Sequence, residues 1–287
     1  MNFIEKYMKE TNEGNIIVGK KVKKIYEKLL KESNDNSLPF YFDEEKGNRP
    51  IEFIETFCKQ AEGEIGKPIK LELFQKAYIQ ALFGFVYRDT GLRRFNETMF
   101  LVGRKNGKTT LLSAIALYMM IADGEGSAEC YSVATKKDQA SKAFKSACAM
   151  RAQSPEIRAI ISKRRTDMYM PSTFSSFEPL SSDSDTLDGL NSHLVIIDEL
   201  HAIKDRNLYE VMKQSTSSRR QPLVVMITTA GTVRECIFDD IYSYANNVLN
   251  GTTKNDSFLP ILYELDKTDE WKDIKCWQKA NPRTWNY

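Results

Sequence analysis

The strongest structural signal in the chain is the run Met99-Phe100-Leu101-Val102-Gly103-Arg104-Lys105-Asn106-Gly107-Lys108-Thr109-Thr110. Its apolar start predicts a strand, and the glycines and polar residues that follow predict a tight loop opening into a helix. A loop of this kind turns successive backbone N–H groups toward one point. The following helix directs its positive end to the same point. We therefore expect this loop to bind a phosphate group.

Two side chains of the loop have the chemistry that nucleotide phosphates need. Lys108 can reach the β- and γ-phosphates, and the Thr109 hydroxyl can ligate Mg²⁺. The strict motif asks for a glycine where this chain has Val102, and Gly103 stands one residue too close. The context supports the motif, because apolar residues follow at helical spacing. They are Leu111, Leu112, Ala114, Ile115, Leu117 and Tyr118.

A second segment, residues 194–201, has the sequence Leu-Val-Ile-Ile-Asp-Glu-Leu-His. Four apolar residues running into two carboxylates predict a buried parallel strand with acids at its carboxyl end. In open α/β sheets that end faces the ligand crevice. Asp198 is placed to hold Mg²⁺, and Glu199 to orient and deprotonate the water that attacks the γ-phosphate. A core strand ending in solvated acids is the alternative. Together with the phosphate loop, the segment predicts a nucleotide hydrolase.

A third segment, Leu223 to Gly231, predicts another buried strand, which ends in two hydroxyls and a glycine. Thr228 and Thr229 at the crevice end of a neighbouring strand can sense the γ-phosphate or the attacking water. The alternative is that they cap a following helix, expected from Val233 to Leu249.

Composition excludes several classes of protein. The 287 residues are 41% hydrophobic and 28% charged, which suits one large α/β domain with an appendage or two small domains. No apolar run approaches the roughly 20 residues of a membrane span, and the N-terminus lacks the build of a signal peptide. The odd, scattered cysteines predict reduced cytosolic thiols rather than disulfides or a metal site. They are Cys58, Cys130, Cys148, Cys236 and Cys276.

A net charge of +2 does not by itself indicate a nucleic-acid-binding protein. Basic residues at 20–24 lie on an amphipathic helix and are expected to form a solvated face. The run Lys163-Arg164-Arg165 leaves phosphate contact open.

Strand and helix patterns alternate along most of the chain, which predicts a parallel sheet with helices on both faces. Helices are expected at 16–31, 50–61 and 72–87, and an irregular stretch is expected from 153 to about 192. The remaining predictions are strands at 98–102, 128–134, 193–198, 222–228 and 257–263, with helices at 108–122, 136–152, 206–217 and 232–250.

With these segments combined, the chain resembles the large subunit of a tailed-phage terminase, a DNA-packaging motor, over about residues 20–285. A phosphate loop that departs from the strict motif is itself typical of that family. The sequence segments that carry the resemblance are Phe53-Ile54-Glu55, Leu73-Phe74-Gln75, Leu82-Phe83-Gly84-Phe85, Thr90 to Phe95, Arg104 to Thr109, Leu187 to Asn191, Asp198 to His201, Thr228 to Gly231 and Ala280-Asn281-Pro282.

The resemblance implies a P-loop NTPase of the additional-strand, catalytic-glutamate type, with a mainly parallel sheet flanked by helices and a helical N-terminal appendage. It further implies a ring of ATPases in the host cytoplasm that drives double-stranded viral DNA into a procapsid, working with the portal protein and the terminase small subunit. The implied divisions are a helical subregion at 1–70, the ATPase at 71–265, and the start of a linker at 266–287.

The resemblance also assigns roles to residues, with ATP and Mg²⁺ as ligands. Asp198 and Thr109 would hold the metal, Glu199 would be the general base, and Gln75 would contact adenine. Thr228 and Thr229 would couple hydrolysis to movement. The nucleotide would be bound by Gln75, Arg104, Lys105, Asn106, Gly107, Lys108, Thr109, Thr110, Thr228 and Thr229, with Lys108 also acting in catalysis.

Two departures from the family pattern stand out. Some relatives carry an Arg-Gly pair before the acid strand, where this chain has Asp188-Gly189. Arg219 and Arg220 are the candidates for the missing arginine, which would act on a neighbour's ATP. The alternative is a solvated helix terminus favoured by the helix dipole. The clustered acids of a nuclease domain are also absent, so we expect no nuclease activity in this chain.

Two other functions stay open at this stage. Asp198-Glu199-Leu200-His201 also matches the acid box of certain helicases, although a second sheet domain would have to fit within the 287 residues. A docking module that binds ATP but hardly hydrolyses it is the other possibility, although Lys108 and both acids are intact.

Overall fold

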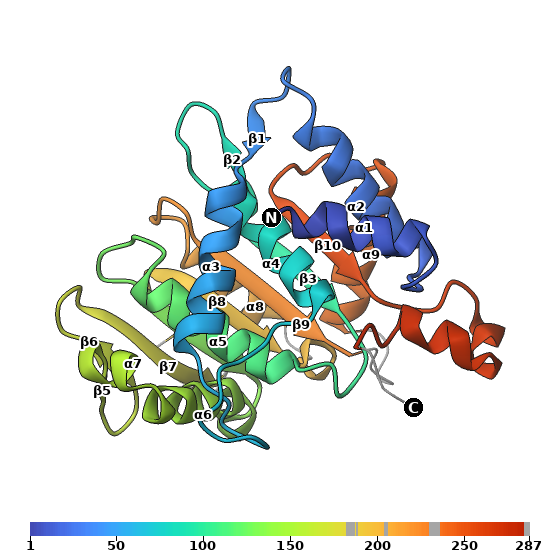
Figure 1. Cartoon of the computed structure of the whole chain (residues 1–287). Helices are drawn as coiled ribbons and strands as arrows, with labels where there is room; N and C mark the ends of the chain where they lie inside the picture. Colours follow the sequence, from blue (N-terminus) through green and yellow to red (C-terminus); the bar gives the residue numbers. More distant parts are fainter. Residues whose placement is uncertain (182–186, 188, 204–205, 230–235, 284–287) are drawn as a thin grey trace.

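The computed structural model describes residues 1–181, 187, 189–203, 206–229 and 236–283 of the chain. Within that part, one eight-stranded sheet forms the centre of the molecule, with strand order β10-β3-β9-β8-β4-β7-β6-β5 (Figure 1). Its strands are β3 (Glu97–Leu101), β4 (Glu129–Ala134), β5 (Ser162–Lys163), β6 (Met168–Met170), β7 (Ser175–Ser181), β8 (Ser192–Asp198), β9 (Leu223–Thr228) and β10 (Phe258–Leu262).

The sheet is mainly parallel, as predicted. Strands β10, β3, β9, β8, β4 and β7 pair in parallel, whereas β6 and β5 are added antiparallel at one edge. Strand β9 lies between β3, which leads into the phosphate loop, and β8, which ends in the acids. This inserted strand confirms the additional-strand type of P-loop fold.

Helices cover both faces of the sheet. The helices are α1 (Phe3–Asn12), α2 (Lys20–Ser33), α3 (Glu44–Phe57), α4 (Leu73–Gly84), α5 (Lys108–Ile121), α6 (Lys137–Gln153), α7 (Pro155–Ile160), α8 (Arg206–Gln214) and α9 (Ile237–Asn250). In Figure 1, α4 and α5 lie in front of the sheet and α8 lies behind it.

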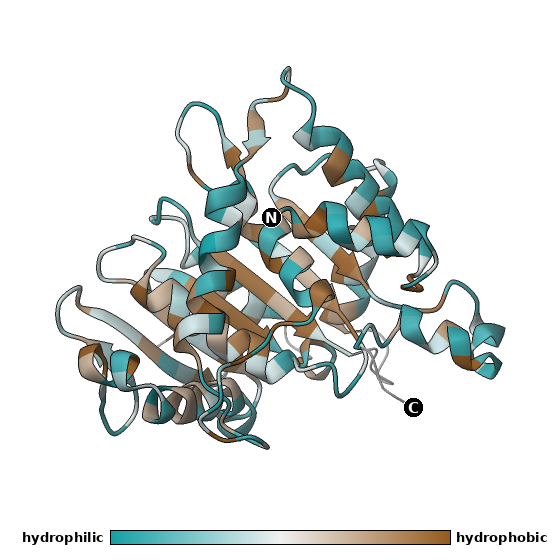
Figure 2. Ribbon diagram, in the orientation of Figure 1, coloured by the Kyte–Doolittle hydropathy of each residue, from teal (hydrophilic) through white to brown (hydrophobic). Residues whose placement is uncertain are grey.

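The apolar strands explain why both faces are covered. Successive side chains of a strand point to opposite faces. In β8, Leu194 and Ile196 join the core on the α4–α5 side, and Val195 and Ile197 join the core on the α8–α9 side. Figure 2 shows these strands as hydrophobic and the outer faces of the helices as largely hydrophilic. None of the helices among the described residues has the length and hydrophobicity to cross a bilayer.

The N-terminal residues pack directly on this core. Helices α1 and α3 lie against α4, and α2 lies against β10. Tyr7 of α1 accepts a hydrogen bond from the hydroxyl of Tyr263, just after β10, over 3.1 Å. Buried residues of α1 to α3 therefore belong to the same hydrophobic cluster as α4 and α5.

Several expected elements differ from those observed. Helix α1 was not predicted, and the helix expected from Pro50 begins at Glu44, because Asp43 caps it by accepting the Lys46 N–H over 3.0 Å. The helix expected over 72–87 stops at Gly84. Residues Phe85–Tyr87 instead form β2, paired antiparallel with β1 (Phe40–Phe42).

The stretch expected to be irregular contains α7 and strands β5, β6 and β7. Strand β7 is mostly polar and only partly buried, so it lacks the hydrophobic pattern from which a strand is predicted. The core elements from β3 to β10 match the expected order with shifted bounds. Helix α8 ends three residues early, and residues 232–235 of the last expected helix lie outside the described residues.

Candidate functional site

The carboxyl ends of β3, β8 and β9 bring the three predicted segments to one edge of the sheet. Leu101 of β3 is in register with Thr228 of β9, and Asp198 of β8 is in register with Ile227. Because these strands are parallel, the phosphate loop, the two acids and the threonine pair all begin at the same level.

The phosphate loop runs from Val102 to Gly107 and turns into α5. Two of its residues have left-handed backbone, Lys105 with φ of 66° and Gly107 with φ of 73°. Gly107 suits this conformation because it lacks a Cβ, whereas Lys105 adopts it at an energetic cost. Gly107 is the N-cap of α5 and offers no side chain, so the first-turn N–H groups stay available for an anion.

Lys108 lies over the loop and beside the acids. Its Nζ is 3.4 Å from the Val102 carbonyl oxygen and 3.5 Å from that of Gly103. Burial lowers the pKa of the Lys108 ammonium, and the charges of Glu199 and Asp198 oppose that shift. This half-buried cation is therefore placed to meet a phosphate group.

Asp198 is buried, and its Oδ1 accepts the Glu199 N–H over 2.9 Å. Burial and the adjacent Glu199 carboxylate raise the pKa of Asp198, while that N–H and Lys108 oppose the rise. The Asp198 carboxylate and the hydroxyl of Thr109, at the start of α5, are oxygen donors of the kind that Mg²⁺ prefers. A divalent cation would also relieve the electrostatic cost of holding Asp198 ionised.

Glu199 has a strained backbone. Its φ of 58° is in the left-handed region, which is rare for residues other than glycine and is common at functional sites. Its N–H also donates to the Ile227 carbonyl of β9 over 3.1 Å, which holds the strained residue against the neighbouring strand. The Glu199 side chain is 30% exposed, so water can approach it.

His201 also belongs to the site, although it was not predicted as a site residue. Its Nε2 lies 3.2 Å from Glu199 Oε2, and its Nδ1 lies 2.9 Å from the Thr228 hydroxyl. The Thr228 carbonyl in turn accepts the Val102 N–H of the phosphate loop over 3.1 Å. A continuous chain of contacts therefore joins Glu199 to the phosphate loop through β9. The only sequence signal was the position of His201 two residues after the acid.

The threonine pair is buried at the end of β9. Thr228 is fully buried, and its hydroxyl donates to the Thr229 carbonyl over 2.9 Å. Helix α9 begins at Ile237 with Cys236 as its N-cap, so neither threonine caps it. The contact of Thr228 and Thr229 with a nucleotide stays a prediction. Ala230 and Gly231 lie outside the described residues.

A cavity of about 690 Å³ opens beside the loop, on the side of α4 and α6. Gln75 lines it, as do Asn106, Gly107, Thr109 and Thr110. The Gln75 Oε1 accepts the Glu72 N–H over 3.0 Å, and its Nε2 is 3.5 Å from the Asn106 carbonyl. Gln75 thus caps α4 and touches the loop. Lys142, Lys145 and Arg283 also line the cavity, and none of them was predicted.

The remaining predicted residues divide between the two ends of the sheet. Arg104 and Lys105 are exposed on the loop. Arg219 lies at the opposite edge, where its guanidinium donates to the carbonyls of Asn191, Gly126 and Ser127 over 2.6 to 3.0 Å. That side chain is 6% exposed. Its predicted action on a neighbour's nucleotide stays a prediction.

Arg220, beside it, is exposed, and its role stays a prediction. Asp188 of the departure Asp188-Gly189 lies outside the described residues.

Comparisons with known proteins agree with this geometry. A family model described as "Terminase large subunit, ATPase domain" matches residues 73–247, which is more than half of the chain. The terminase large subunit of Lactococcus phage p2 is 24% identical, over 98% of this chain and 52% of that protein. The terminase large subunit of Enterobacteria phage HK97 is 25% identical, over 83% of this chain and 46% of that protein.

Among solved structures, the HK97 bacteriophage large terminase superposes with a TM-score of 0.70 and 23% identity. That superposition covers 83% of this chain and 48% of the other, and it supports the fold. The chain therefore spans about half the length of the curated relatives that it matches.

Proposed function

The chain belongs to the terminase large subunit ATPase-domain family, and from this premise we propose that it hydrolyses ATP to drive double-stranded viral DNA into a procapsid. The observation that supports this most directly is the convergence of Lys108, Asp198 and Glu199 at the carboxyl edge of the sheet. A bound phosphate, a metal and an attacking water each need one of these three groups.

The chain's own residues divide the work as follows. The first-turn N–H groups of α5 and the Lys108 ammonium hold the phosphates, and Asp198 with Thr109 would hold Mg²⁺. Bound Mg²⁺ would neutralise charge on the phosphates and on the leaving oxygen. The Glu199 carboxylate, partly exposed, orients the attacking water and takes its proton. His201 keeps that carboxylate in place.

The nucleoside is proposed to lie in the cavity between α4 and α6, where Gln75 adjoins the loop. Lys142 and Lys145 of α6 add positive charge to its wall. The finer partners follow from the family: double-stranded DNA, the portal protein, the terminase small subunit and further copies of this chain in a ring, acting in the host cytoplasm.

Neither alternative function gains support. The helicase type requires a second large sheet, and residues 1–181, 187, 189–203, 206–229 and 236–283 contain one eight-stranded sheet and a two-stranded one. A docking module without turnover would not require Glu199 to be held in a strained conformation beside a buried Asp198. No nuclease activity is proposed for this chain.

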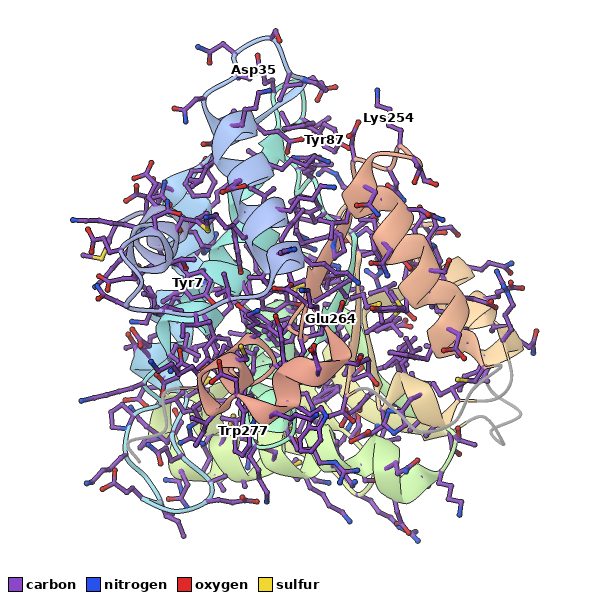
Figure 3. The ribbon with its side chains drawn as sticks, turned by 90° about the vertical axis from the view of Figure 1, so that its right-hand side faces the viewer. Tyr7, Asp35, Tyr87, Lys254, Glu264 and Trp277 are labelled. Carbon is purple, nitrogen blue, oxygen red and sulfur yellow. The ribbon has the colours of Figure 1, made fainter. Side chains whose placement is uncertain are left out.

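Phosphate release in the presence of ATP and Mg²⁺ tests the proposal. Wild-type protein is expected to turn over ATP, and Lys108→Ala is expected to lose both turnover and ATP binding. The matched control is Lys254→Ala, which should behave as wild type. Lys254, labelled in Figure 3, is exposed and precedes the amino end of β10, whereas the site lies at the carboxyl ends of the strands. Turnover retained in Lys108→Ala would contradict the assignment of the phosphate loop.

A further inference from the structure

The chain returns to the phosphate loop after it leaves the sheet. Beyond β10 it forms two short 3₁₀ helices, Thr268–Lys272 and Ile274–Lys279. Lys279 Nζ pairs with Asp266 and Glu270, each over 2.8 Å, and Asp266 accepts the Lys20 N–H at the start of α2 over 2.7 Å. Figure 3 shows Trp277 on this segment below Glu264, which lies where the chain leaves β10. Its course is therefore fixed against the core.

The end of this segment, residues 280–283, is bonded to the phosphate loop. We call these four residues the clasp. The Gly103 N–H donates to the Ala280 carbonyl over 2.9 Å. The Asn106 Nδ2 donates to Asn281 Oδ1, and the Arg283 N–H donates to Asn106 Oδ1, each over 3.1 Å. Residues that are 175 positions apart in sequence thus share one hydrogen-bond network.

Asn106 is the centre of that network. Its side-chain amide also donates to the carbonyls of Gly103 and Arg104 within the loop, each over 3.1 Å, and the residue is 2% exposed. The predicted role of Asn106 in binding nucleotide can therefore concern its main chain only, because its side chain joins the loop to the clasp.

The close approach of the clasp also explains Gly103. A Cβ at this position would lie 2.1 Å from Asn281 Oδ1 and 2.9 Å from the Ala280 carbonyl oxygen. Since the φ of Gly103 is not in the left-handed region, contact with the clasp is what requires glycine here. This explains a glycine one residue away from its place in the strict motif.

We propose that the clasp is a positioning device for the phosphate loop, with Asn281 as its main contact, and that nucleotide binding and clasp closure are thermodynamically linked. This inference rests on the proposed function. To bind a phosphate, the loop must keep its N–H groups directed at one point. In this conformation the backbone of Lys105 is left-handed, which costs energy, so the conformation needs other contacts to stabilise it. Contacts that stabilise the binding shape raise nucleotide affinity, and by linkage bound nucleotide stabilises those contacts.

The chain supplies its own probe for this linkage. Its three tryptophans, Trp271, Trp277 and Trp285, all lie in the last 17 residues of the sequence, so intrinsic tryptophan fluorescence reports on this segment alone. The Trp277 carbonyl accepts the Asn281 N–H over 2.9 Å, which connects the probe directly to the clasp. Trp277 is 44% exposed, so its emission is sensitive to its surroundings.

The experiment titrates the full chain with ADP and Mg²⁺ and follows tryptophan emission, with the affinity measured independently by calorimetry. In wild type, emission is expected to change with a midpoint equal to the calorimetric Kd. Asn281→Ala is expected to bind ADP about three- to tenfold more weakly, the usual effect of one lost hydrogen bond, and to lose the emission change. Lys275→Ala, an exposed change in the same segment, is the control and should match wild type.

Gly103→Ala offers a second route to the same contact. It should weaken ADP binding by pushing out the clasp, and its effect should be smaller in an Asn281→Ala background, because the nearest clash is then gone. ADP binding with unchanged emission, or with unchanged affinity in Asn281→Ala, would overturn the clasp proposal alone. Absence of nucleotide binding in wild type would instead overturn the proposed function.

Discussion

Asp198 is a single residue whose buried carboxylate, needed for the proposed function, lowers the stability of the folded protein at neutral pH. Burial and the charge of Glu199 raise its pKa above the ordinary 3.8. The folded protein therefore holds the Asp198 proton more tightly than the unfolded chain does. This contribution to stability is complete at low pH and is lost as pH rises through the raised pKa, so that ionised Asp198 is destabilising at neutral pH.

Asp198→Asn removes this buried charge and should therefore raise Tm at neutral pH without Mg²⁺. The expected rise is about 2–4 °C for each kcal/mol of unfavourable electrostatic energy that is removed. Asparagine keeps the oxygen that accepts the Glu199 N–H. Scanning calorimetry with and without Mg²⁺ checks this, since the metal should raise Tm of wild type only. A lower Tm for the variant in metal-free buffer would contradict the electrostatic explanation.

Replacement of His201 is expected to affect catalysis more than substrate binding. His201 lies between the Glu199 carboxylate and the Thr228 hydroxyl, so its removal should misplace the base without removing a phosphate contact. His201→Ala should lower kcat about tenfold or more, with KM for ATP nearly unchanged. His201→Gln, which retains a donor for the carboxylate, should recover part of the loss. A rise in KM with normal kcat would assign His201 to ground-state binding instead.

At the scale of elements, Arg219 fastens the turn before β9 to the amino ends of β4 and β8. Arg219→Ala would leave the carbonyls of Gly126, Ser127 and Asn191 without this donor, and should lower the free energy of unfolding by about 2–3 kcal/mol. Urea denaturation measures this, with the exposed neighbour Arg220→Ala as a near-neutral control. Normal stability with defective turnover in Arg219→Ala would instead support its predicted catalytic role.

Elements with a strong local signal could be predicted from sequence. The apolar run of β8 and the spacing of α5 determine both structure and chemistry within a few residues. Strand β7 could not be predicted, because its mostly polar residues show no hydrophobic pattern. Backbone pairing with β4 holds this strand in the sheet. The hydrogen bonds of Arg219 could not be predicted either, since they depend on the end of the sheet at which its side chain lies.

For the whole molecule, the least predictable feature is the contact between the phosphate loop and the clasp. It joins residues that are 175 positions apart in sequence, and no local pattern indicates that they meet. Gly103 was one sign in the sequence, as a glycine that the strict motif did not explain. Ala280-Asn281-Pro282 was another, as a segment typical of the family to which no structural role was assigned. The predicted division of the chain at positions 70 and 265 stays a prediction, although α1 to α3 share a hydrophobic cluster with α4 and α5.

If Glu199 is the general base for hydrolysis of ATP held by this phosphate loop, its replacement should abolish turnover but not binding. ATP turnover per chain should be followed over a wide range of protein concentrations, with Mg²⁺, for wild type and Glu199→Gln. We predict that wild-type turnover rises with concentration as neighbouring copies complete the site, and that Glu199→Gln binds ATP normally but turns it over about 10²–10⁴ times more slowly. Equal turnover by the two proteins would show that Glu199 is not the general base.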